Sequence, residues 1–82
     1  MADVTYFVAL PFVAANDGVA LGIPVECLSS GAAILRAESL SRREGIVGAI
    51  AFCRSGDLSS GTFEDAKVLK KFGDVPDDLS GL

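Results

Sequence analysis

The residues best suited to chemistry lie in one polar segment, 54–61, which reads Arg-Ser-Gly-Asp-Leu-Ser-Ser-Gly. Glycines in such a segment let backbone amides point toward a bound anion, and an arginine adds positive charge. We therefore consider a small-ligand or anion site formed by Arg54, Ser55, Gly56, Ser59, Ser60 and Gly61. The segment is not a P-loop, because Thr62 follows Gly61 where that motif has lysine. A plain solvated turn has the same composition and is the alternative interpretation.

Catalytic chemistry is poorly supported by the remaining residues. The chain has no histidine, so a serine or cysteine nucleophile would lack its most common activating base. Cys27 and Cys53 each lie in an apolar segment, where a thiol acts as a small hydrophobic side chain. A disulfide between the two cysteines is the alternative interpretation. Arg54 follows Cys53, but neighbouring residues of a strand point to opposite faces. Glu26 would be a candidate acid or base only if it were buried, and we expect it to face solvent. We predict a protein that is not an enzyme.

Metal and nucleic-acid sites are also disfavoured by the composition. Zinc sites need several cysteine or histidine ligands, and the segment that starts at Asp57 lacks two ligand positions of a calcium loop. The formal net charge is −4, whereas nucleic-acid binding draws most of its affinity from Lys and Arg on phosphates. The arginines that could form a small basic patch are Arg36, Arg42, Arg43 and Arg54. We predict no metal, no cofactor and no nucleic-acid partner.

A strand followed by a turn opens the predicted fold. Residues 4–13 are rich in β-branched and aromatic side chains and are apolar on both alternating faces, which is typical of a strand covered on both sides. Pro11 cannot donate to a strand ladder, so we expect an edge, a bulge or the end of pairing there. The sequence at 16–18, Asn-Asp-Gly, is a turn signal, and residues 19–28 predict the returning strand.

The apolar run from Val4 to Ala15 also resembles the core of a signal peptide. Asp3, however, precedes it where a signal peptide has Lys or Arg. The run has 12 residues, which is too short to cross a bilayer as a helix. We therefore interpret it as a buried strand and expect a cytoplasmic protein without membrane contact.

A helix and two further strands complete the predicted order. Residues 31–44 predict a helix that Ser29 or Ser30 caps and that Gly45 ends. Residues 46–53 carry no charge and predict a central strand. Residues 62–72 fit either a lysine-protected edge strand or a helix, and we favour the strand. The acidic stretch 74–82 predicts a mobile tail.

This order predicts one small α+β domain over residues 1–82. Its architecture would be a two-layer β-β-α-β-β fold, with one helix on one face of a mostly antiparallel four-stranded sheet. If residues 62–72 were helical, the order would be β-β-α-β-α.

One helix covers only one face of such a sheet, although the strands are apolar on both. The opposite face would expose Phe7, Val13, Val47 and Ala49, and an apolar patch of that kind indicates an interface. A small domain also gains stability from a second subunit. We therefore expect a homodimer, formed face to face or edge to edge, that serves as an accessory or regulatory interaction module. Another, unidentified protein partner is the alternative.

Overall fold

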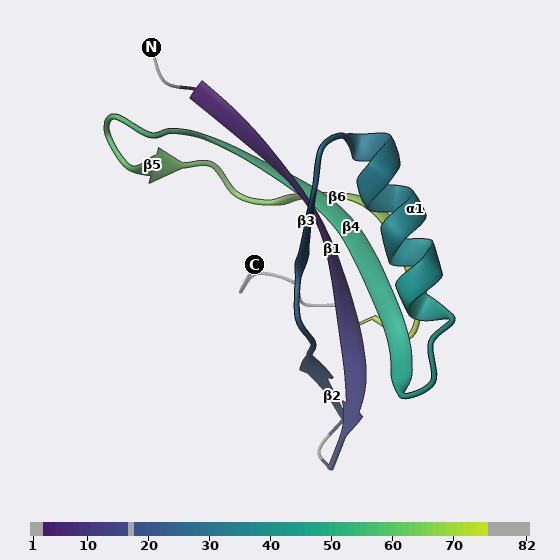
Figure 1. Cartoon of the computed structure of the whole chain (residues 1–82). Helices are drawn as coiled ribbons and strands as arrows, with labels where there is room; N and C mark the ends of the chain where they lie inside the picture. The colour runs from purple at the N-terminus through teal and green to yellow at the C-terminus, as the bar shows by residue number, and fades with distance from the viewer. Residues whose placement is uncertain (1–2, 17, 76–82) are drawn as a thin grey trace.

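Two long antiparallel strands form the centre of a sheet that shorter strands extend on both sides (Figure 1). The computed structural model describes residues 3–16 and 18–75. Its elements are β1 (Asp3–Ala15), β2 (Gly18–Leu21), β3 (Val25–Cys27), α1 (Ser30–Ser41), β4 (Ile46–Asp57), β5 (Thr62–Phe63) and β6 (Lys67–Gly73). β1 pairs with β4, β2 and β3 both pair with the other side of β1, and β5 and β6 both pair with β4. The sheet is thus four strand positions wide.

This arrangement confirms the predicted α+β fold with a single helix on an antiparallel sheet. The segment 62–72 forms strands, so the helical alternative is wrong. Pro11 lies inside β1 rather than at its end. Its carbonyl accepts a hydrogen bond of 2.8 Å from the Gly22 amide, at the point where the outer strand is interrupted between β2 and β3.

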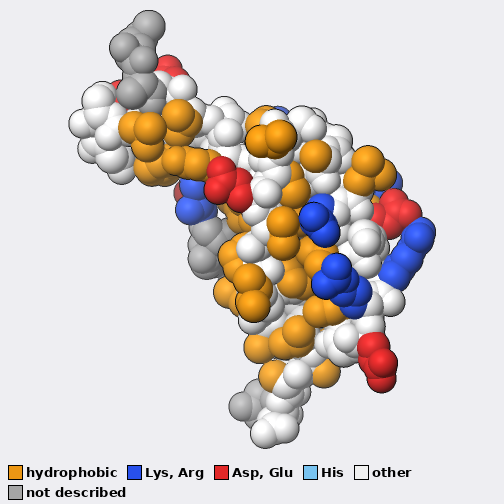
Figure 2. Space-filling model, viewed as in Figure 1, with side chains coloured by type: hydrophobic (Ala, Val, Ile, Leu, Met, Phe, Trp, Pro, Cys, Tyr) orange, Lys and Arg blue, Asp and Glu red, His pale blue; other side chains and the backbone are white. Residues whose placement is uncertain are grey.

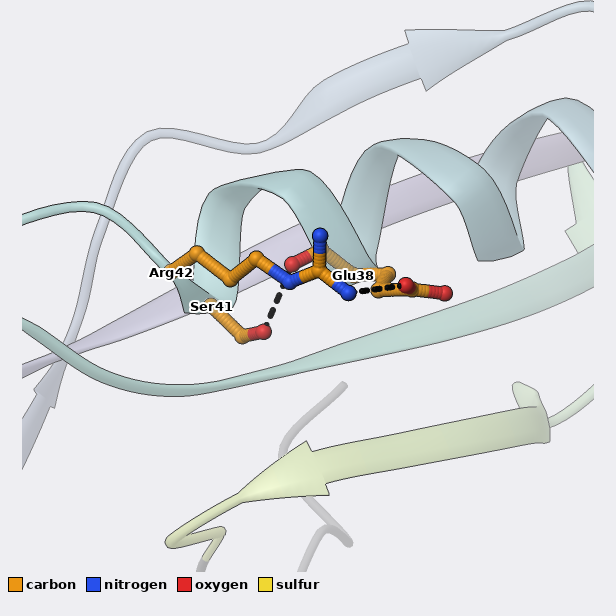
Figure 3. A network of polar contacts seen from close by, with 3 residues as sticks. All are labelled: Glu38, Ser41 and Arg42. Atoms are coloured by element: carbon orange, nitrogen blue, oxygen red, sulfur yellow. Dashed lines mark hydrogen bonds and ion pairs between the residues drawn. The ribbon is translucent and has the colours of Figure 1, made fainter.

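Helix α1 is shorter than its sequence pattern suggests. Ser29 caps it, because the Ser29 hydroxyl accepts a 3.1 Å hydrogen bond from the Ala32 amide. At the other end, Arg42 forms an exposed ion pair with Glu38, while the Ser41 hydroxyl donates to the Glu38 carbonyl (Figure 3). The helix ends at Ser41, so Arg42 is its C-cap rather than part of its last turn. Within the described residues, no helix is long and apolar enough to span a membrane.

Small side chains let α1 lie close against the sheet. The buried residues of this contact are Ala9, Ala33, Ala37, Leu40, Ala49 and Ala51. Half-buried larger side chains, including Phe7 and Phe72, pack around them. Because alanine lies on both sides of the contact, the helix backbone comes close to the strands. The space between helix and sheet is therefore closely packed.

The opposite face of the sheet holds a second buried cluster. Leu10, Phe12 and Ile50 are between 0% and 4% exposed, and Val47 is among the half-buried residues that pack on them. The chain crosses nearby after β6: Gly73 has a positive φ of 68°, and the Asp74 amide donates to the Val47 carbonyl at 2.9 Å. The centre of the sheet is therefore buried on both faces.

Candidate functional site

The first half of the polar segment 54–61 is strand and only its second half is a turn. Arg54, Ser55 and Gly56 belong to β4, which runs to Asp57 because it pairs with the first residues of β1. Only residues 58–61 form the turn. Together with the start of β1 and with β5, this end of β4 extends beyond the helix (Figure 1). We call residues 3–6 and 54–63 the arm.

The turn of the arm is held by its own hydrogen bonds. The Asp57 carboxylate accepts from the Ser59 amide at 2.9 Å and from the Ser59 hydroxyl at 2.7 Å. These contacts, the hydroxyl first, hold the pKa of Asp57 below its ordinary value. Gly61 donates its amide to the Asp57 carbonyl at 2.8 Å and has a positive φ of 72°. The Ser59 groups are therefore engaged within the turn.

A shallow hollow on the arm carries acidic rather than basic groups. Its lining consists of Asp3, Val4, Thr5, Ser55, Gly56, Asp57, Ser60, Thr62 and Glu64. No described Lys or Arg lines it, so its carboxylates oppose the approach of an anion. Of the six residues in the predicted anion site, Ser55, Gly56 and Ser60 line the hollow. Among the described residues, no group of three or more His, Cys, Asp or Glu side chains could hold a metal ion. Anion binding by the segment stays a prediction without support from this geometry.

The four residues expected on one uncovered face do not lie together. Phe7 and Ala49 pack beneath α1, and Ala49 is fully buried. Val47 packs on the opposite cluster. The cause is a register shift: Phe12 pairs with Gly48 but Val13 pairs with Ile46, which leaves Val47 as an extra residue in the ladder. The expectation of one shared, uncovered face is therefore wrong, and Ala49 is not accessible to a partner.

The two cysteines lie on opposite sides of one strand. Cys27 and Cys53 both pair with Phe7, from β3 and β4 respectively. Two strand spacings separate their backbones by about 10 Å, which is beyond the reach of a disulfide. Both thiols are free, and an intrachain bridge between them is excluded.

The two edges of the sheet differ in chemistry. The β6 edge carries Lys67, Lys70 and Lys71, all exposed, and such charges discourage pairing with another strand. On the other side, large aliphatic side chains are exposed: Leu21 is 62%, Ile23 84% and Leu28 98% exposed. Figure 2 shows hydrophobic side chains running along this side of the molecule. We call residues 18–28 the apolar edge.

A hollow between the apolar edge and the helix adjoins these side chains. It is lined by Val25, Glu26, Cys27, Ala32, Leu35, Arg36 and Ser39. Leu35 is 69% exposed and belongs to α1, so the apolar surface continues from β3 onto the helix. Sequence reasoning missed this surface. Two features of the sequence could have indicated it. Leu28 lies directly before the helix cap, and Leu35 lies outside the buried positions of the helix, which are Ala33, Ala37 and Leu40.

No protein-family model matches this chain, and neither the curated proteins nor the solved structures contain a match to it. Functional conclusions therefore rest on the chain's own chemistry.

Proposed function

We propose that this protein works by association, as a non-enzymatic interaction module that forms a homodimer through its apolar edge. The observation that carries the proposal is the exposure of Leu21, Ile23, Leu28 and Leu35 on one side of the molecule. Burial of apolar surface is the main favourable contribution to most protein association. Full burial of one such side chain contributes about 1.5–3 kcal/mol.

The distribution of charge supports the choice of this surface. Within residues 18–28, Glu26 is the one charged side chain of the described positions. The β6 edge, with its three lysines, would repel a second copy of itself. Among residues 3–16 and 18–75, β2 and β3 pair with β1 alone, so within this part of the chain their other side has no partner strand. A strand edge with exposed aliphatic side chains is a template for pairing with another chain.

Removing the aliphatic side chains of the apolar edge is expected to separate the subunits. The double variant Ile23→Ser and Leu28→Ser should weaken the dimer by about 100-fold or more, because each change occurs twice in a symmetric interface. Light scattering after size-exclusion chromatography, across a dilution series, measures the effect. The fold should persist, since both side chains are exposed in the single chain.

The matched control is Leu58→Ser, which replaces another exposed leucine, on the arm. This variant should keep the mass of the unmodified protein. Equal masses for the double variant and the unmodified protein over the dilution series would contradict the proposal.

A further inference from the structure

We propose that residues 76–82 cross the face of the sheet opposite α1 and cover the cluster of Leu10, Phe12 and Ile50. We call these seven residues the strap. The inference is independent of the proposed function. It follows from the burial of the cluster, from the direction in which the chain leaves β6 and from the charges on this face.

The cluster is more deeply buried than the described residues around it explain. Leu10, Phe12 and Ile50 are 4%, 2% and 0% exposed, although α1 covers the other face of the sheet. Among residues 3–16 and 18–75, the half-buried hydrophobic residues that pack on the cluster are Val47, Phe52 and Val75. Of these three, Val75 alone lies outside the strands. One valine spans only part of the cluster, so further residues must lie over it.

The chain leaves β6 in the direction of this cluster. The Asp74 amide donates to the Val47 carbonyl at 2.9 Å. A Cβ atom on Gly48 would meet the backbone of Asp74, so the chain passes directly over β4 there. Gly48 pairs with Phe12 of β1, and Val75 already packs on the cluster. The strap therefore starts on the face opposite α1 and is directed from β4 toward β1.

The strap has the length and the side chains that this position requires. Its sequence is Pro-Asp-Asp-Leu-Ser-Gly-Leu. Neighbouring strands lie about 4.8 Å apart, and the cluster occupies only β1 and β4. The chain from Val75 to Leu79 extends to about 13 Å, which is more than this spacing. Leu79 therefore reaches every member of the cluster and supplies an apolar side chain to cover it.

Charge complementarity favours the strap over a second copy as the cover. Ile50 pairs with Lys71, and paired residues share a face of the sheet, so Lys71 lies beside the cluster. Arg54 lies on the same face, at even spacing from Ile50 in β4. The strap brings Asp77 and Asp78, which have the opposite charge. A second copy docked through this face would bring like charges together instead.

The position of Glu26 indicates where along the strap the acidic residues lie. Glu26 pairs with Val8 and so adds a negative charge at the β3 margin of this face. The positive side chains come from β4 and β6. Because Asp77 and Asp78 stand at the start of the strap, we place them on the β4 side, away from Glu26.

A tryptophan in place of Leu79 tests this seating. The chain has no tryptophan, so Leu79→Trp supplies a single indole emission. Its emission maximum should lie at shorter wavelength than that of Leu58→Trp, a control position 55% exposed on the arm, and urea should abolish the difference. Equal maxima for the two variants in buffer would overturn the inference. The difference should also persist on dilution, whereas its loss on dilution would assign the cover to a second copy and overturn the inference as well.

A stability measurement decides the question without an added indole. Leu79→Asp should lower the thermal midpoint by at least about 6 °C, because it removes an apolar side chain from the cover of the cluster. Leu58→Asp is the matched control and should change the midpoint by about 2 °C or less. Similar shifts for the two variants would contradict a strap over the cluster.

The charge contact is tested in the Leu79→Trp background. Lys71→Glu should move the emission to longer wavelength, because the new carboxylate repels the acidic residues of the strap. Lys70→Glu makes the same change of charge on the helix side of the sheet, since Lys70 pairs with Ala51. It should leave the emission unchanged. Equal effects of the two substitutions would overturn this seating of the strap.

Discussion

Replacement of Phe12 by alanine is expected to lower the free energy of unfolding by about 4 kcal/mol. Phe12 is 2% exposed and packs with Leu10 and Ile50 on the sheet face that α1 does not cover. Truncation removes the apolar side chain and leaves a cavity that the surrounding strands fill only partly. Since small domains have about 5–15 kcal/mol in total, the loss is a large part of the stability.

Urea denaturation followed by circular dichroism measures this loss. The matched control is Phe63→Ala, which truncates the same kind of side chain at a position 39% exposed on the arm. Its ring lies over Gly56 and near Tyr6, with ring centroids 6.0 Å apart, so we expect a smaller loss of about 1 kcal/mol. Equal losses for the two variants would contradict the second buried cluster.

Replacement of Gly48 by alanine is expected to lower the free energy of unfolding by about 3 kcal/mol. A Cβ atom at this position would meet the backbone of Asp74, where the chain crosses after β6. That obstacle is main chain, so no rotation of a flexible side chain relieves the clash. The Gly73 turn and the hydrogen bond from Asp74 to Val47 would have to shift.

The control for Gly48→Ala is Gly31→Ala in α1. There a Cβ would have its nearest neighbour at 4.0 Å, and the helix gains from alanine by up to about 1 kcal/mol. The two substitutions should therefore move the thermal midpoint in opposite directions. For a domain of this size, 3 kcal/mol corresponds to a decrease of about 12–24 °C. A midpoint for Gly48→Ala at or above that of the unmodified protein would disprove the close crossing.

Local patterns were sufficient to predict the order of the elements. Strand-forming residues at the start, a serine cap before residue 30 and an uncharged run at 46–53 each correspond to an observed element. The preference for a strand over a helix at 62–72 is confirmed by β5 and β6. The end of β4 was predicted four residues too early, at Cys53 rather than Asp57. Polar residues extend that strand because β1 supplies a partner as far as Asp3.

The face of the sheet on which each strand side chain lies could not be predicted, because it depends on the register between the strands. Phe7 and Ala49 lie under the helix, and the irregularity between Phe12 and Val13 displaces Val47 to the other side. A single extra residue reverses the alternation of side chains, and no local signal marks it. The predicted mobile tail, 74–82, lies outside the described residues except for Asp74 and Val75.

The candidate surface was also beyond sequence reasoning. An apolar strand can be central or at an edge, and only the pairing of β2 and β3 with β1 alone leaves Leu21, Ile23 and Leu28 exposed. The surroundings of the predicted anion segment also depend on strand pairing that the sequence does not show. Its residues are close in sequence, but strand pairing places the carboxylates of Asp3 and Glu64 beside Ser55 and Gly56.

Amide hydrogen exchange of the unmodified protein at two concentrations tests the central claim most directly. If copies associate through the apolar edge, peptides that cover residues 18–28 should exchange more slowly at high concentration than at low concentration. Peptides from the β6 edge and the turn of the arm should exchange equally at both, because those segments lie away from the apolar edge. Slowing confined to residues 67–73, or no dependence on concentration in any peptide, would contradict association through the apolar edge.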